Sequence, residues 1–127
     1  PRISTFEING VRVYLGKNNL QNEYLTRTLA RKSDLWFHAK GYHGAHVICT
    51  DPQPEESLLR TCAMLAAYYS KGRYSSSVPV DYCAIRQLKK VPGSKAGMVT
   101  MQSYRTIYID PDAKAIAALH ADHQIRK

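Results

Sequence analysis

The sequence of 127 residues lacks the features of a membrane protein and of a disulfide-stapled domain. No apolar run approaches the roughly 20 residues of a membrane-spanning helix, and the N-terminus has no basic segment followed by an apolar stretch, as signal peptides have. The only cysteines, Cys49, Cys62 and Cys83, are dispersed and form no CxxC pair. We therefore expect buried thiols in a reducing, cytoplasmic compartment, no membrane partner and no cysteine-based zinc site.

The motifs of several enzyme classes are also missing. There is no GxSxG elbow for a nucleophilic serine, no HExxH for a zinc hydrolase, and no GxxxxGK or GxGxxG loop for phosphates. Cys49 follows His46 closely, but it lies in a predicted apolar strand, where an inert buried thiol is the usual outcome. These absences favour a non-catalytic protein without a cofactor.

Acidic residues are scarce: ten Asp and Glu oppose eighteen Lys and Arg, so the net charge is +8. Residues 57–109 contain eight basic side chains against the single carboxylate of Asp81. Clustered positive charge is the electrostatic footprint of a nucleic-acid binder. An acidic protein partner would fit the same charge, and a basic surface without a specific partner is the simplest alternative.

The length and the 44% hydrophobic content suit one globular domain over residues 1–127. Because the chain starts at Pro1 and not at Met, we expect that it is excised from a longer protein. Apolar periodicity and turn residues predict its elements. In chain order we expect a hairpin over 6–16, a helix over 17–33, strands over 34–39 and 45–50, a helix over 51–72, a strand over 78–88, a hairpin of 98–101 and 104–110 that turns through Gln102 and Ser103, and a helix over 111–124.

The order of these elements favours an α+β fold with a mainly antiparallel sheet of hairpins, two principal helices and a short C-terminal helix. The first hairpin has the clearest turn, because Asn9-Gly10 is the dipeptide that a type I′ turn prefers. The second helix would begin at Asp51 or Gln53, each followed by Pro, and would have Gly72 as its C′ residue. The first helix would be capped by Asn18 or Asn19, with an apolar face of Leu20, Tyr24, Leu25, Thr28 and Leu29.

The segment DLWFHAKGYHGAHVI, residues 34–48, holds the only Trp, Trp36, and three of the five histidines. If its two strands pair, His38 and His46 face one another. A metal needs three or four convergent ligands, so a metal-dependent enzyme using His38, His43 and His46 is one alternative. A half-buried, hydrogen-bonded histidine in a sheet is the simpler one.

Nucleic-acid binding has broader support among the residues. Phosphates are contacted by Lys, Arg, Asn and Ser side chains and by helix N-termini, and single-stranded or looped RNA also uses aromatic platforms. The asparagines that start the first helix, Trp36 and Tyr42 near Lys40, and the basic loop from Lys89 to Lys95 offer these groups. The simpler interpretations are a core position for Trp36 and a solvated face for the lysines.

Three long segments follow one another in the chain: LGKNNLQNEYLTRTLARKSDLWFHAKGYHGAHVI, AAYYSKGRYSSSVPVDYCAIRQLKKVPGSKAGMV and TIYIDPD. In this order they resemble the signature of the NFACT-R domain family, and the resemblance covers residues 8–112. Several long motifs in the correct order are far more specific than one short motif.

The resemblance implies the C-terminal domain of bacterial RqcH-like proteins, which are related to eukaryotic NEMF. Such proteins bind the large (50S) ribosomal subunit with a stalled peptidyl-tRNA, recruit alanyl-tRNA and support template-free C-terminal tailing. A non-catalytic RNA-binding module is thus implied, with tRNA, large-subunit rRNA and the remaining domains of the parent protein as partners. Bacterial members are also labelled fibronectin-binding proteins, so the alternative is a protein-binding module for fibronectin or a ribosomal protein.

The implied RNA-binding residues fall into three groups. Contacts to phosphate or ribose are expected from Lys17, Asn18, Asn19, Asn22 and Lys40. Trp36, His38 and His46 are expected to shape the RNA-binding face or to stack on the RNA. Electrostatic attraction is expected from Arg73, Lys89, Lys90 and Lys95.

The chain departs from the family pattern at two turns. Residues 43–46 read His-Gly-Ala-His where the family has Pro-Gly-Ser-His, and residues 95–97 read Lys-Ala-Gly where it has Lys-Pro-Gly. At each turn the missing Pro leaves the backbone φ angle without the restriction that a proline ring imposes. Ala45 lacks the hydroxyl that would hydrogen-bond a phosphate, so it is left out of the expected interface.

Overall fold

The computed structural model describes residues 1–96 and 98–127. Gly97, the last residue of the Lys-Ala-Gly sequence at which the chain departs from the family pattern, lies outside the described residues. The elements are β1 (Ser4–Ile8), β2 (Val11–Gly16), α1 (Asn19–Tyr24), a π-helical turn (Leu25–Leu29), β3 (Leu35–Ala39), β4 (His46–Cys49), α2 (Glu56–Tyr68), β5 (Val78–Ala84), a 3₁₀ turn (Ile85–Gln87), β6 (Leu88–Lys90), β7 (Val99–Met101), β8 (Arg105–Ile109), α3 (Ala113–His123) and β9 (Gln124–Arg126).

Over these residues the predicted α+β class with a mainly antiparallel sheet is confirmed. Seven strands form the main sheet in the order β8-β5-β3-β4-β2-β1-β9, and β6 and β7 form a separate pair. All of the paired neighbours run antiparallel. None of the described helices has the length and the apolar content needed to cross a membrane.

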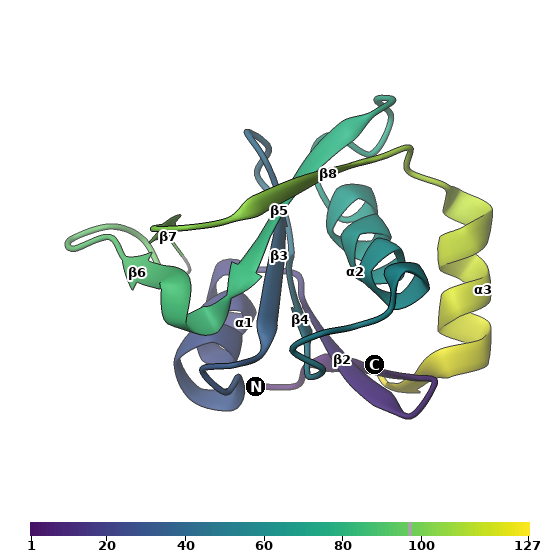
Figure 1. The fold of residues 1–127 in the computed structure, drawn as a ribbon, viewed down its shortest axis with the longest axis horizontal. Coiled ribbons are helices and arrows are strands. Elements are labelled where there is room, and N and C mark those ends of the chain that lie inside the picture. Colours follow the sequence, from purple (N-terminus) through teal and green to yellow (C-terminus); the bar gives the residue numbers. More distant parts are fainter. Residues whose placement is uncertain (97) are drawn as a thin grey trace.

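The main sheet is covered on both faces (Figure 1). α2 and α3 lie against one face, whereas α1, the π-helical turn and the β6–β7 pair lie against the other. Successive side chains of a strand point to opposite faces of the sheet. Phe37 of β3 therefore belongs to the buried cluster that contains Leu65 of α2, whereas the neighbouring Trp36 belongs to a second buried cluster that contains Leu25 of the π-helical turn. The central strands therefore contribute to two apolar layers.

The first hairpin and the cap of the first helix follow the sequence prediction. Asn9 and Gly10 have φ angles of 52° and 79°, as a type I′ turn requires. Asn18 is the N-cap of α1, since its side chain accepts a hydrogen bond from the backbone N–H of Gln21 at 2.9 Å. Local sequence is sufficient to specify both features.

The predicted apolar face of the first helix is partly wrong. Leu20 is 73% exposed, whereas Asn22 and Leu25 are buried against the sheet. Leu20 and Asn22 are two positions apart in the sequence, which places their side chains about 200° apart around the helix. The helix thus turns a polar residue toward the sheet, because Asn22 has a hydrogen-bonding role there.

The second helix begins later and ends earlier than predicted. Its N-cap is Glu55, which makes no side-chain cap bond, and Asp51 instead accepts the backbone N–H of Gln53 in the preceding turn. The helix also ends before Gly72, which is therefore not its C′ residue. Gly72 is needed for packing instead, because a Cβ there would lie 2.9 Å from the ring of Tyr42.

The predicted hairpin of residues 98–101 and 104–110 is wrong. β7 pairs with β6, and β8 pairs with β5 at the edge of the main sheet. Alternating apolar residues predict a strand but not its partner, and pairing with β5 lets Ile107 and Ile109 join the core beneath α2. The prediction also missed β9, which pairs with β1 and so adds the C-terminal segment to the edge of the main sheet.

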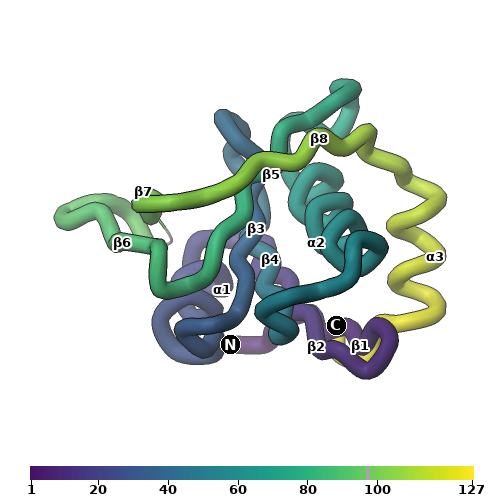
Figure 2. Tube along the Cα trace, in the orientation of Figure 1, coloured from purple at the N-terminus to yellow at the C-terminus, as the bar shows by residue number. Residues whose placement is uncertain are grey.

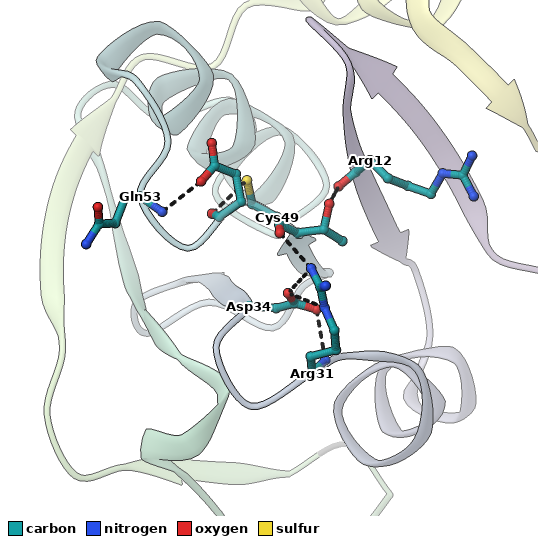
Figure 3. Close-up of polar contacts among 7 residues, drawn as sticks. Arg12, Arg31, Asp34, Cys49 and Gln53 are labelled. Atoms are coloured by element: carbon teal, nitrogen blue, oxygen red, sulfur yellow. Dashed lines mark hydrogen bonds and ion pairs between the residues drawn. The ribbon is translucent and has the colours of Figure 1, made fainter.

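A buried carboxylate ties the segment before β3 to the end of β4 (Figure 3). Asp34 accepts hydrogen bonds from the backbone N–H of Arg31 at 2.8 Å and from its guanidinium at 3.1 and 3.2 Å. The guanidinium of Arg31 also donates to the carbonyl of Thr50 at 2.8 Å. Because a buried charge is tolerated only when it is paired, these bonds fix the path of the chain into β3.

We expect Asp34→Ala to lower the free energy of unfolding by about 2 kcal/mol, since it removes charge-assisted hydrogen bonds at a buried site. Asp51→Ala is the matched control, because its carboxylate accepts one hydrogen bond, from the backbone N–H of Gln53, in an exposed turn. The control should lose about 1 kcal/mol or less. Urea unfolding followed by circular dichroism measures both, and equal losses would contradict the role of Asp34.

Candidate nucleic-acid interface

A row of polar side chains crosses the sheet face that α1 and the β6–β7 pair cover. The strand register places Thr106 of β8 opposite Asp81 of β5, and Asp81 opposite His38 of β3. On β4 the row continues with His46, whose ring centroid lies 5.4 Å from that of His38. Four strands thus bring together polar groups that are far apart in the sequence.

Asp81 is the buried anion of this row. Its carboxylate pairs with the ammonium of Lys40 at 3.0 Å and accepts a hydrogen bond from Thr106 at 2.8 Å. Lys40 also donates to the hydroxyl of Tyr104 at 3.3 Å, and its ammonium lies 4.6 Å from that ring's centroid. The hydrogen bond to Asp81 raises the pKa of Lys40, so Lys40 is a permanently charged group held in one place.

The rings of Trp36, His38 and His46 pack against one another. Trp36 stacks on His38 with centroids 5.6 Å apart, and His46 meets both rings edge-on. Burial lowers the pKa of His46 to about 3. It also lowers the pKa of His38, although the nearby carboxylate of Asp81 opposes that shift. Both imidazoles are therefore neutral at pH 7 and offer hydrogen bonds without charge.

Gly16 allows α1 to approach this row closely. Oδ1 of Asn22 accepts the backbone N–H of His46 at 3.2 Å. A Cβ on Gly16, which lies opposite His46 in β2, would come within 2.5 Å of that same oxygen and 2.8 Å of Leu25. Because Gly16 has no side chain, Asn22 can pack closely against the sheet at this position.

These residues line a cavity of about 250 Å³. The lining combines the three rings and Asp81 from the sheet, Asn19 and Asn22 from α1, Lys40 and His43 from the β3–β4 connection, and residues of the segment 98–101. Trp36 and His46 are 2% and 4% exposed. They therefore shape the wall of the cavity, and the ring of Trp36 is not an open stacking platform.

Three predicted lysines lie on the β6–β7 pair, which extends from the body of the molecule (Figure 2). Lys89 and Lys90 belong to β6 and Lys95 to the connection that follows, and all three are exposed. Lys90 pairs with Glu23 of α1 at 3.1 Å. Within residues 1–96 and 98–127, Lys89 and Lys95 form no ion pair and present their charge to solvent.

The remaining predicted residues have other surroundings. The ammonium of Lys17 lies 5.8 Å from the ring centroid of Tyr69, and the side chain of Asn18 is used as the helix cap. The guanidinium of Arg73 lies 4.2 Å from the ring centroid of Tyr68 and donates to its hydroxyl. The structure thus gathers six predicted residues at the cavity, namely Asn19, Asn22, Trp36, His38, Lys40 and His46.

The three histidines near β3 and β4 do not converge as metal ligands. The rings of His38 and His46 pack edge to face, and His43 is exposed on the connection between the strands. In the part of the chain that the structure describes, no three His, Cys, Asp or Glu side chains are grouped so that they could hold a metal ion. The geometry gives no support to the metal-enzyme alternative.

Sequence reasoning missed several residues at this site. A lone carboxylate within the apolar run VPVDYCAI is a signal for a buried charge that needs a partner, so Asp81 was identifiable from the sequence. The contribution of residues 98–101 was not, because it depends on how the β6–β7 pair folds over the sheet. Only the register of β5 and β8 reveals Thr106.

Known proteins resemble this chain over most of its length. Residues 3–103 match the family model described as NFACT protein RNA binding domain. The Rqc2 homolog RqcH of Bacillus subtilis (strain 168) is 44% identical over 120 residues, which cover 94% of this chain and 21% of that protein. The protein of the same name from Streptococcus pneumoniae serotype 2 is 44% identical over 108 residues, which cover 84% of this chain and 20% of that protein.

The chain therefore spans about a fifth of the length of these curated relatives. A solved structure, the C-terminal part of the fibronectin/fibrinogen-binding protein from Streptococcus suis, is similar with a TM-score of 0.88 and 37% identity. This similarity covers 94% of the chain and 49% of the solved one. The α+β architecture is thus shared with a known protein.

Proposed function

Because the chain belongs to the family of NFACT RNA-binding domains, we propose that it is the RNA-binding module of a ribosome quality-control factor. Residues 1–127 form one non-catalytic domain of a longer, cytoplasmic, ribosome-associated protein. The module binds tRNA and large-subunit rRNA on a stalled 50S subunit that carries peptidyl-tRNA. It supports the recruitment of alanyl-tRNA for C-terminal tailing. Relatives named RqcH support this assignment.

The observation that carries the proposal is a polar cavity with fixed and exposed cations around it. Lys40 is held at the lining by Asp81, and Lys89 and Lys95 stand exposed on the neighbouring β6–β7 pair. Ammonium groups attract phosphates of any sequence, and the net charge of +8 adds to this attraction at longer range. Asn19 supplies an amide for ribose or phosphate at the same place.

The chain should bind tRNA with an affinity that falls as salt rises. Each phosphate that a Lys or Arg neutralises releases counterions, so the logarithm of the association constant should fall by about 0.7 to 0.9 per contact for each tenfold rise in salt. Fluorescence anisotropy of labelled tRNA over a potassium chloride series measures this slope. Binding without salt dependence, or no binding at micromolar protein, would contradict the proposal.

A protein-binding module is the second candidate, since the solved relative is named a fibronectin/fibrinogen-binding protein. The positive charge also suits an acidic protein surface. A pull-down from RNase-treated extract, followed by binding to purified fibronectin or to purified ribosomal proteins, distinguishes the two candidates. A partner that survives RNase and binds directly would favour this alternative, whereas the loss of ribosomal material after RNase favours RNA binding.

A further inference from the structure

A second cavity, of about 300 Å³, lies between the π-helical turn and the β9 edge of the main sheet. One wall comes from Tyr24, the last residue of α1, and from Leu29 of the π-helical turn, whereas the other comes from β1, β2 and β9. Its described lining residues do not include any that line the cavity beside the histidines. π-helical segments are rare and often occur at functional sites, so this cavity is a candidate for a site of its own.

The strand register brings two arginines to this second cavity. Thr5 of β1 lies opposite Arg126 of β9 and opposite Tyr14 of β2, so these three side chains share one face of the sheet. Arg12 is two residues before Tyr14 in the same strand and therefore points to that face as well. The guanidiniums of Arg12 and Arg126 thus reach the cavity from the two strands that flank β1.

The positive charge of both arginines is available to a ligand. Arg126 is exposed, and among the residues that the structure describes it forms no ion pair. Arg12 pairs with Glu7 at 3.7 Å, but both of these side chains are about half exposed, so solvent screens their attraction. Guanidinium groups bind oxyanions through two parallel hydrogen bonds, which makes an anionic group the fitting ligand here.

The phenol groups of Tyr14 and Tyr24 add hydrogen-bond donors to the same cavity. Both side chains are only partly buried, and their hydroxyls are accessible and make no hydrogen bond within the described part of the chain. A phosphomonoester carries three acceptor oxygens and a charge of about −1.5 to −2 at pH 7. It therefore matches two guanidiniums and two hydroxyls better than a carboxylate, which has fewer oxygens and a single charge.

Apolar side chains restrict the body to which that phosphate is attached. Ile3, Leu29 and Ile125 line the cavity, and Ile125 is 54% exposed although it is apolar. The volume is at the lower end of the roughly 300 to 1,000 Å³ of clefts that hold small molecules. An RNA backbone is polar on both sides of each phosphate, so the apolar walls favour a small molecule with a compact apolar or aromatic body.

From these observations we infer that the cavity between the π-helical turn and β9 binds a small phosphomonoester with an apolar or aromatic body. Arg12 and Arg126 hold its phosphate, Tyr14 and Tyr24 donate hydrogen bonds to it, and the apolar side chains pack against its body. The inference goes beyond the proposed function and does not depend on it, because none of these residues belongs to the candidate nucleic-acid interface.

Phenyl phosphate is the probe for this site, and NMR spectra of the ¹⁵N-labelled chain report where it binds. We expect a Kd of about 1 mM or tighter, as is usual for so small a ligand in a fitting site, with the largest shifts at backbone N–H groups of β1, β2 and β9. Phenol lacks the phosphate, inorganic phosphate lacks the ring and benzoate replaces the phosphate by a carboxylate. Each of these three should bind at least about fivefold more weakly, because each loses one part of the match.

Arg126→Gln should weaken the binding of phenyl phosphate about tenfold, since it removes charge-assisted hydrogen bonds to the phosphate. Lys127→Gln is the matched control, because it removes the same charge from the next residue, which does not line the cavity. The control should change the affinity by less than about twofold. Tyr24→Phe keeps the ring but removes one hydroxyl, and a loss of about threefold or more there tests the opposite wall.

The possible outcomes separate this site from the proposed function. No shift at millimolar phenyl phosphate, shifts confined to other strands, or equal losses in Arg126→Gln and Lys127→Gln would each refute the site. Equal affinity for phenyl phosphate and inorganic phosphate would reduce it to a nonselective anion contact and overturn the inference. A tRNA affinity that falls further in Arg126→Gln than in Lys127→Gln would assign the arginine to RNA instead. The salt dependence of tRNA binding in the wild type tests the proposed function separately, so either idea can fail alone.

Discussion

Acidification from pH 7 to about pH 4.5 should lower the free energy of unfolding by about 2 to 3 kcal/mol through His46 alone. Burial lowers the pKa of His46 in the folded chain to about 3, whereas the unfolded chain takes up the proton near pH 6.5. Between these values the unfolded state binds more protons, so the stability falls as the pH falls. The lowered pKa of His38 acts in the same direction.

Urea unfolding at the two pH values, with wild type and His46→Gln, measures this effect. The variant has no imidazole at this position, so it should lose less stability on acidification than the wild type does. His123→Gln on α3, which lies against the opposite face of the sheet (Figure 1), is the matched control and should keep the wild-type pH dependence. Equal acid losses in wild type and His46→Gln would refute the assignment.

The double variant Lys89→Glu/Lys95→Glu should bind tRNA about a hundredfold more weakly than the wild type at moderate salt. Each lysine that contacts a phosphate contributes about one unit to the salt slope, so reversing both charges removes two attractions and adds two repulsions. The slope of affinity against salt should fall by about two units. The Lys90–Glu23 ion pair is left intact, so the β6–β7 pair keeps its link to α1.

The control for this experiment is Lys114→Glu/Lys127→Glu, at exposed positions on α3 and at the C-terminus. Both double variants take four units from the net charge of +8, so long-range attraction weakens equally. Anisotropy titrations with labelled tRNA compare them. If the two variants lose affinity to the same extent, only the net charge matters and the β6–β7 lysines have no special place in the interface.

The parts of the fold that depend on local chemistry could be predicted from the sequence. Asn9-Gly10 specifies its turn through positive φ angles, and Asn18 specifies a helix start because its side chain accepts a neighbouring backbone N–H. Apolar alternation also predicted β3 and β4 and the proximity of His38 and His46. The resemblance of the long motifs to NFACT-R domains was sufficient for the family, because the order of the motifs is specific.

The choice of partners was decided by tertiary structure. β7 and β8 have the sequence pattern of strands, but their pairing with β6 and β5 depends on which edges are free and which apolar faces α2 covers. The same holds for β9, a short strand at the end of α3 that pairs with β1. Periodicity carries no information about strand partners, so these predictions failed or were missing.

The sequence by itself determined the charge, the strand signature around Trp36 and the family. Only the tertiary structure decided that Trp36 and His46 are walls of a cavity, that Asp81 holds Lys40 in place and that both imidazoles beside it are neutral. Burial and distance set these properties, and they arise only when α1, four strands of the sheet and the β6–β7 pair meet. The histidine-rich segment that suggested metal ligands instead places the neutral imidazoles of His38 and His46 beside Trp36 in the wall of the cavity.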